Sequence, residues 1–127
     1  MLYYINHRTE GPRLYRSRRD AALLLTRYKT RLEVGNQVLV DYLLLPTSLE
    51  ALISCPFPIK KGSEVPHHLV LGLLAHLARM GRMWPFSGTY ELYNGGPGYA
   101  ELGKSGAEVL PYPLSVIIDA KRASAAV

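Results

Sequence analysis

The chain has 127 residues, of which 48% are hydrophobic and 20% charged, a balance that is typical of a folded protein and excludes intrinsic disorder as the default state. Its length fits a single domain covering residues 1–127. Cys55 is the only cysteine, which excludes an intramolecular disulfide, and the longest apolar run, residues 69–77, is far shorter than the roughly 20 residues that cross a bilayer. We therefore expect a soluble intracellular protein, cytoplasmic or nuclear, without a transmembrane segment.

The basic charge is concentrated near the N-terminus. The formal net charge is +5, and residues 1–31 hold eight basic residues against two acidic ones, Glu10 and Asp20. The remaining 96 residues hold seven basic and eight acidic residues. Clustered guanidinium groups attract phosphates and carboxylates and present paired donors to them. The charge distribution therefore predicts one anion-binding face on a nearly neutral body.

The first two predicted elements are a short strand at residues 2–5 and an amphipathic helix at residues 18–34. Ser17 and Asp20 are typical of a helix N-terminus, since the hydroxyl caps a free N–H and the carboxylate suits the first turn. Gly35 is typical of a helix C-terminus. The basic segment therefore begins in a loop and continues along this helix.

The middle of the chain predicts a strand and a short helix. Residues 37–45 are rich in Val and Leu, which indicates a mostly buried strand in which Asp41 is the polar exception. Thr47 followed by Glu50 resembles a helix-capping pair, and Pro56 would end that helix.

The rest of the chain predicts a long helix at residues 66–80 closed by Gly81, a hairpin with arms at 89–93 and 99–102, and a last strand at 114–119. The fold class is therefore α+β. We expect a small antiparallel or mixed sheet, with two long helices and one short helix packed mainly on one face.

Residues 98–105 resemble the phosphate-loop pattern GxxxxGK[ST] letter for letter. A working loop of that kind needs a buried strand before it and a helix after it. Here Pro97 and neighbouring glycines precede the segment, and Pro111 would end any helix that followed. We therefore expect a glycine-rich hairpin at this position.

The histidines of the second long helix do not have metal-ligand spacing, since His68 and His76 are eight residues apart and lack a neighbouring Cys or carboxylate on that helix. They share a narrow polar stripe with Gly72 and Ala75, whereas most of the helix circumference is apolar. One interpretation is a core helix whose stripe meets solvent. The other is that the helix packs on a second copy, and we expect a homo-oligomer through the region around Gly72 and Ala75.

No sequence motif identifies a catalytic nucleophile. An acid–base nuclease could be assembled from His7, His68 or His76, because a general base and a phosphate clamp are the minimum that RNA cleavage requires. We assign no catalytic residue, metal site or cofactor from the sequence, and an enzyme is the less favoured interpretation.

Arginines and tyrosines alternate in the N-terminal segment, which suits neutralisation of a backbone by Arg and stacking on aromatic rings. A solvated helix face would explain the same residues, but such a face normally mixes both signs of charge. The predicted anion-binding residues are Arg8, Arg13, Tyr15, Arg16, Arg18, Arg19, Arg27 and Arg31.

The composition and the basic segment together predict a non-enzymatic binding or assembly module that engages a polyanion, with nucleic acid, RNA or DNA, as the leading partner. One alternative is a small structural or matrix-type protein whose basic face contacts an anionic membrane or an acidic protein. The second alternative is the histidine-dependent nuclease.

Overall fold

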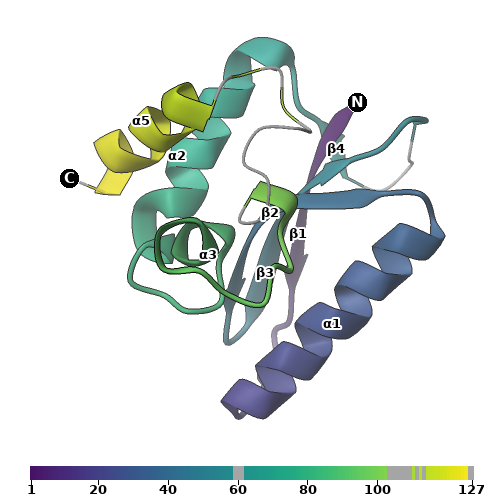
Figure 1. The fold of residues 1–127 in the computed structure, drawn as a ribbon. Helices are drawn as coiled ribbons and strands as arrows, with labels where there is room; N and C mark the ends of the chain where they lie inside the picture. The colour runs from purple at the N-terminus through teal and green to yellow at the C-terminus, as the bar shows by residue number, and fades with distance from the viewer. Residues whose placement is uncertain (59–61, 103–109, 111, 113, 126–127) are drawn as a thin grey trace.

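The computed structural model describes residues 1–58, 62–102, 110, 112 and 114–125 of the chain. Its centre is a four-stranded antiparallel sheet with strand order β2-β3-β1-β4 (Figure 1). The strands are β1 (Leu2–Arg8), β2 (Val38–Leu45), β3 (Ser48–Ser54) and β4 (Ser63–Glu64).

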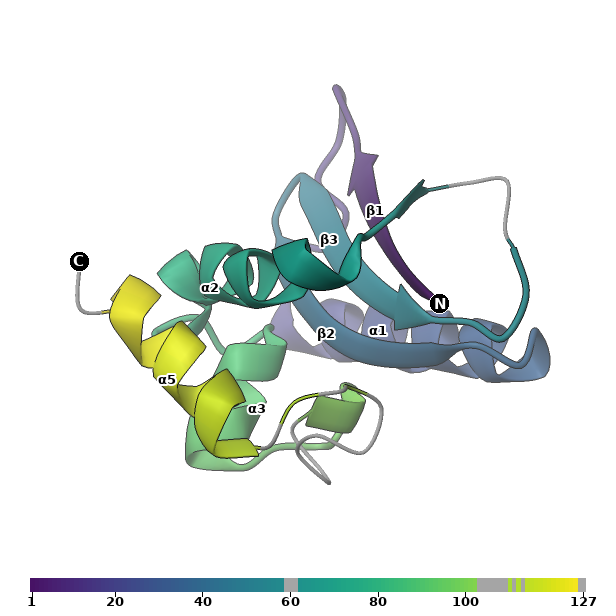
Figure 2. The ribbon, with the colours of Figure 1, turned by 90° about the horizontal axis from the view of Figure 1, so that it is seen from above.

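Helices cover both faces of this sheet. The helical elements are α1 (Arg18–Val34), the 3₁₀ turn η1 (His67–Leu69), α2 (Val70–Gly81), α3 (Gly88–Asn94) and α5 (Leu114–Ala125). Helix α1 lies on one face, whereas α2 and α5 pack together on the opposite side, and α3 lies beside β2 (Figures 1 and 2).

Side chains of the central strands alternate between two hydrophobic clusters. From β3, Ala51 and Ile53 join Leu25 of α1, whereas Leu52 joins Leu74 of α2 and Ile117 of α5. Six consecutive residues of β2 are buried, because the strand is covered from both sides. This is why the expectation of helices mainly on one face is wrong, although the α+β class and the antiparallel sheet are confirmed.

A β-bulge in β2 changes the sheet face on which the Asp41 side chain lies. Leu39 pairs with Ile53 and Asp41 pairs with Leu52, so Val40 is an extra residue in the ladder. An extra residue shifts the in-and-out alternation by one position. Asp41 consequently lies on the side of α3 and α5, where Lys121 of α5 meets it.

The first helix is confirmed at residues 18–34, the strand expected at 37–45 is present as β2, and the helix expected at 66–80 is present as η1 and α2. The strand expected at residues 2–5 is confirmed and extends to Arg8, so the basic segment starts within β1.

The short helix expected after Thr47 is wrong, because Ser48–Ser54 forms β3. This segment pairs with β2 on one side and with β1 on the other, along its whole length. Two ladders satisfy its backbone, which outweighs the weak local preference of a capping pair.

The hairpin expected at residues 89–102 is also wrong, because its first arm is the helix α3, with Ser87 as its N-cap. The strand expected at 114–119 is the helix α5, which packs against α2. Of the phosphate-loop resemblance, residues 103–105 lie outside the described residues. Over the part of the chain that the structure describes, no helix is both long enough and apolar enough to cross a membrane.

Candidate anion-binding groove on helix α1

Local signals fix both ends of α1. The Ser17 hydroxyl accepts a hydrogen bond from the Asp20 N–H at 3.1 Å. At the other end the Gly35 N–H donates to the carbonyl of Arg31, and Asn36 adopts a positive φ of 61°. These caps define the helix on which the predicted arginines Arg27 and Arg31 lie one turn apart.

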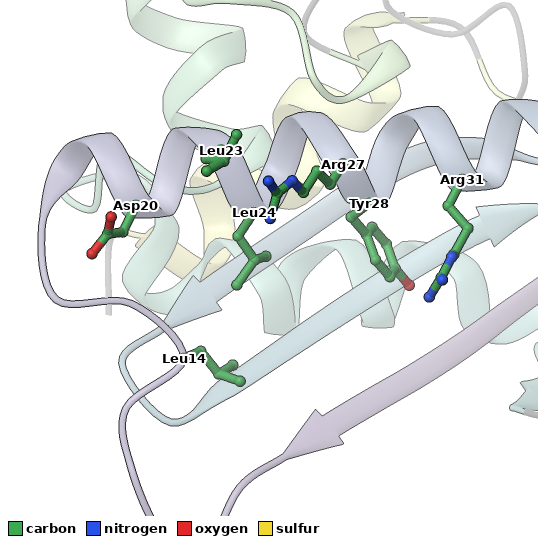
Figure 3. Close-up of a pocket in the computed structure, with 7 residues that line it drawn as sticks. All are labelled: Leu14, Asp20, Leu23, Leu24, Arg27, Tyr28 and Arg31. Carbon is green, nitrogen blue, oxygen red and sulfur yellow. The ribbon is translucent and has the colours of Figure 1, made fainter.

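An open groove of about 590 Å³ runs along one flank of α1 (Figure 3). Leu24, Tyr28 and Arg31 extend from the same side of the helix, and Leu14 of the preceding loop faces them. The complete lining is Leu14, Asp20, Leu23, Leu24, Arg27, Tyr28 and Arg31. The groove therefore combines an apolar and aromatic surface with two guanidinium groups and a single carboxylate.

Two contacts hold the walls of this groove in place. His7 of β1 lies 3.2 Å from the Tyr28 hydroxyl through its Nε2, and the two rings meet edge to face at 5.5 Å. The Leu14 N–H donates to the carbonyl of Pro46 in the β2–β3 turn at 2.7 Å. Burial raises the pKa of Tyr28 to about 12.

Arg27 and Arg31 also line a second hollow of about 370 Å³ on the outer side of α1, together with Thr26, Thr30 and Val34. The arginine pair therefore stands between two neighbouring depressions. This second hollow is open to solvent and its surface is largely apolar. Val34, which is 85% exposed, lines it.

The other predicted arginines are exposed but do not line these hollows. Arg13 and Arg16 lie in the loop between β1 and α1, and Arg18 and Arg19 lie in the first turn of α1. Arg8 follows His7 directly in β1, so its side chain lies on the opposite face of the sheet. The structure thus brings two of the seven arginines to one groove and places the other five near the end of the molecule where β1 ends and α1 begins (Figure 1).

Among the described residues, no acidic side chain forms an ion pair with these arginines. The ion pairs within the described ranges join Lys29 to Glu33, His76 to Glu50, and Lys121 to Asp41, and none includes one of the seven predicted arginines. Their guanidinium groups are therefore available to an external anion.

Tyr15, the eighth predicted residue, packs with its ring against the α1-side cluster. Its ring meets Phe86 edge to face at 5.4 Å, and its hydroxyl is buried without a hydrogen-bond partner among the described residues. Desolvation raises the pKa of this hydroxyl. A role for Tyr15 in ligand stacking stays a prediction.

Sequence reasoning missed a buried polar network on the other side of the sheet. Lys121 and Asp41 are fully buried, with Nζ 2.7 Å from Oδ2, and Lys121 also donates to Thr89 Oγ1 at 2.6 Å. The space beside Asp41 is filled by Gly88, where a Cβ would overlap the carboxylate oxygen. The one signal in the sequence was a charged residue inside the apolar strand 37–45.

Glu91 of α3 is a second buried carboxylate, and its partners Tyr42 and Ala100 belong to the α1-side cluster. Its carboxylate accepts hydrogen bonds from the backbone N–H groups of Tyr99 and Ala100, at 2.9 and 3.1 Å, and from the Tyr42 hydroxyl at 3.2 Å. Desolvation raises the pKa of Glu91, although its three donors oppose that shift. The Asp41 carboxylate therefore joins β2 to α5, and the Glu91 carboxylate joins α3 to β2 and to the segment at residues 99–100.

Within the described ranges, no group of three His, Cys, Asp or Glu side chains is arranged to hold a metal ion. No protein-family model, curated protein or solved structure matches this chain.

Proposed function

We propose that the protein binds a polyanion, with single-stranded nucleic acid as the leading candidate, along the exposed flank of α1. The observation that carries the proposal is the arginine pair Arg27 and Arg31, which stands between two adjacent hollows and has no ion pair among the described residues.

The chemistry of the groove favours a ligand that is both anionic and partly flat. Guanidinium groups bind phosphate through paired N–H donors. Leu14, Leu24 and the Tyr28 ring provide an apolar surface next to these donors, on which an unpaired base can lie. A hollow on each side of the arginine pair suits a ligand that repeats along its length, such as a nucleic-acid strand.

The test is the salt dependence of binding, measured by fluorescence anisotropy with a short labelled single-stranded RNA and its DNA counterpart. Affinity should fall steeply with salt and should depend little on base sequence. In the variant R27A/R31A two phosphate contacts are lost, and the slope of log affinity against log salt should decrease by about 1.4, or about 0.7 for each contact.

The matched control is R82A/R122A, which removes the same charge from exposed positions outside the groove. Equal losses in the two variants would show that only net charge matters and would contradict a site on α1. Affinity that does not change with salt would also contradict it. Binding to anionic vesicles or to an acidic polypeptide, without affinity for RNA or DNA, would support the membrane or protein alternative in its place.

We also propose that copies associate through the start of α2. Leu69 is 51% exposed, and nothing lies within 4 Å of the position that a Cβ on Gly72 would take. A second helix can therefore approach closely there. Light scattering at micromolar concentration should give at least the mass of a dimer, and G72E should reduce it to the 14.2 kDa of one chain. A wild-type protein with the mass of one chain would overturn this part.

A further inference from the structure

A second polar cluster lies on the sheet face opposite the groove, where α2 packs. It joins Tyr4 of β1, Glu50 of β3 and His76 of α2. The Tyr4 hydroxyl donates to Glu50 Oε1, and the same oxygen lies 2.9 Å from His76 Nε2. The Glu50 side chain is only 13% exposed, whereas the His76 side chain is 47% exposed. One nearly buried carboxylate thus holds an imidazole at the surface.

This contact determines which ring nitrogen of His76 is the base. A carboxylate only accepts hydrogen bonds, so Nε2 must carry the proton that is donated to Glu50. In the neutral ring the lone pair is then on Nδ1, which has no partner among the residues that the structure describes. A carboxylate that fixes the orientation and the tautomer of a histidine is the arrangement found beside a histidine general base.

Two exposed arginines lie beside this cluster, one near His76 and one near Tyr4. Arg79 follows His76 by three residues on α2, and such residues are neighbours on a helix surface. Arg8 lies on the same face of β1 as Tyr4, and its positive charge acts on the Tyr4 hydroxyl. The cluster of Tyr4, Glu50 and His76 therefore has one cationic neighbour from the helix and one from the sheet.

We infer that His76, positioned by Glu50 and flanked by Arg8 and Arg79, is a general-base site for cleavage of the RNA backbone. RNA fits because its own 2′-hydroxyl is the nucleophile, so that a base and an anion clamp are sufficient. His76 is the catalytic residue of this site, and Glu50 is a positioning residue.

The reaction balances without an oxidant or a second substrate. His76 Nδ1 takes the proton of a 2′-hydroxyl, the 2′-oxygen forms a bond to the adjacent phosphorus, and the bond from phosphorus to the 5′-oxygen breaks. Water supplies the proton to the leaving 5′-oxygen, and the imidazolium returns its proton to water. The products are a 2′,3′-cyclic phosphate and a 5′-hydroxyl, and the arginines stabilise the additional negative charge at phosphorus.

The test is incubation of the full chain, in excess and with EDTA, with a short labelled single-stranded RNA. Wild-type protein should produce fragments that end in a 2′,3′-cyclic phosphate, and the same strand with 2′-O-methyl groups should stay intact. H76A should lower the cleavage rate by a factor of about 100 or more. The matched control is H68A, which removes an exposed histidine of the neighbouring turn η1. This variant should cleave RNA at the wild-type rate.

Further variants separate catalysis from a structural tie between α2 and the sheet. H76Q keeps a donor for Glu50 without a titratable ring, so it should fold and bind RNA as wild type does but should not cleave. E50Q should lower the rate by a factor of about 10 to 100 and shift the pH profile, because His76 loses its orienting carboxylate. Added imidazole should restore part of the H76A activity.

Intact RNA after prolonged incubation with wild-type protein would overturn the inference, as would equal cleavage by H76A. This inference goes beyond binding on α1 and fails separately from it. Salt-dependent RNA binding without cleavage would remove only the His76 site, whereas cleavage by a protein whose RNA affinity is unchanged in R27A/R31A would count against α1 alone.

Discussion

On the α1 side of the sheet, Arg27 and Arg31 are exposed and have no ion pair among the described residues, whereas on the opposite side Asp41 and Lys121 are fully buried and bonded to each other. The exposed charges contribute little to stability, because solvent screens them. The buried charges are different, since each would be strongly destabilising without its partner. The comparison shows that charge holds the fold together on one side and is available to a ligand on the other.

Removal of Lys121 should have the largest effect. Lys121→Met leaves the Asp41 carboxylate buried without its cation, which should lower the free energy of unfolding by about 3–5 kcal/mol in urea denaturation. The control Arg122→Met changes the next residue of α5, which is exposed, and should have little effect. Adding Asp41→Asn to Lys121→Met should recover part of the loss, and no recovery would contradict the unpaired charge as its cause.

Alkaline pH should lower the free energy of unfolding by a smaller amount, and Tyr28, which lines the groove, is one source of this effect. Its pKa of about 12 lies above the value of about 10 in the unfolded chain, because the hydroxyl is buried. The folded protein therefore holds this proton to higher pH, and the resulting stability is complete below about pH 10 and is lost as pH rises through about 12.

Desolvation also raises the pKa of Tyr42, which is buried in the α1-side cluster, so its hydroxyl acts in the same direction. Urea denaturation between about pH 9 and 11 should show a decline of at most about 1.4 kcal/mol per pH unit for each such tyrosine. Tyr28→Phe should make this decline less steep. A Tyr28→Phe protein with the same pH dependence as wild type would indicate that Tyr28 is not buried against β1.

The arginine pair should have the smallest effect on stability. R27A/R31A should change the free energy of unfolding by less than about 0.5 kcal/mol, since both side chains are exposed and away from the cores. A loss comparable to that of Lys121→Met would mean that the pair stabilises α1, and the contrast between the two sides would disappear.

The elements that sequence analysis predicted correctly are those with local signals. The ends of α1 follow from Ser17, whose hydroxyl bonds the Asp20 N–H, and from Gly35, whose N–H bonds the last turn. These contacts involve residues close in sequence, so the pattern of residue types contains the information.

The elements predicted incorrectly depend on distant partners. Ser48–Ser54 is a strand because β1, some 46 residues away in sequence, pairs with it, as in the contact between Tyr4 and Glu50. The β-branched residues of α5 favour a strand locally, but a helix places Ile117 and Lys121 one turn apart on the same buried side.

In the candidate site, too, the features with local signals could be predicted from the sequence, and those that depend on distant residues could not. The four-residue spacing of Arg27 and Arg31 predicted that they share a helix flank, and both line the groove. The other wall could not be predicted, because Leu14 is placed by a hydrogen bond to Pro46, and His7 comes from β1. For the second cluster, Glu50 meets His76 only because a predicted helix is a strand.

The additional residue in β2 links the pairing register of the sheet to the attachment of the C-terminal helix. If the ladder continued from Leu39 without the bulge, Val40 would pair with Leu52 and Asp41 would pair with Ala51, which faces α1, so Asp41 would turn away from Lys121. A shift of a single position would then leave two opposite charges stranded in separate hydrophobic interiors. A β2–β3 hairpin paired in the wrong register would therefore lose the ion pair that attaches α5. The extra residue in β2 thus makes the folded state more stable than these misregistered alternatives.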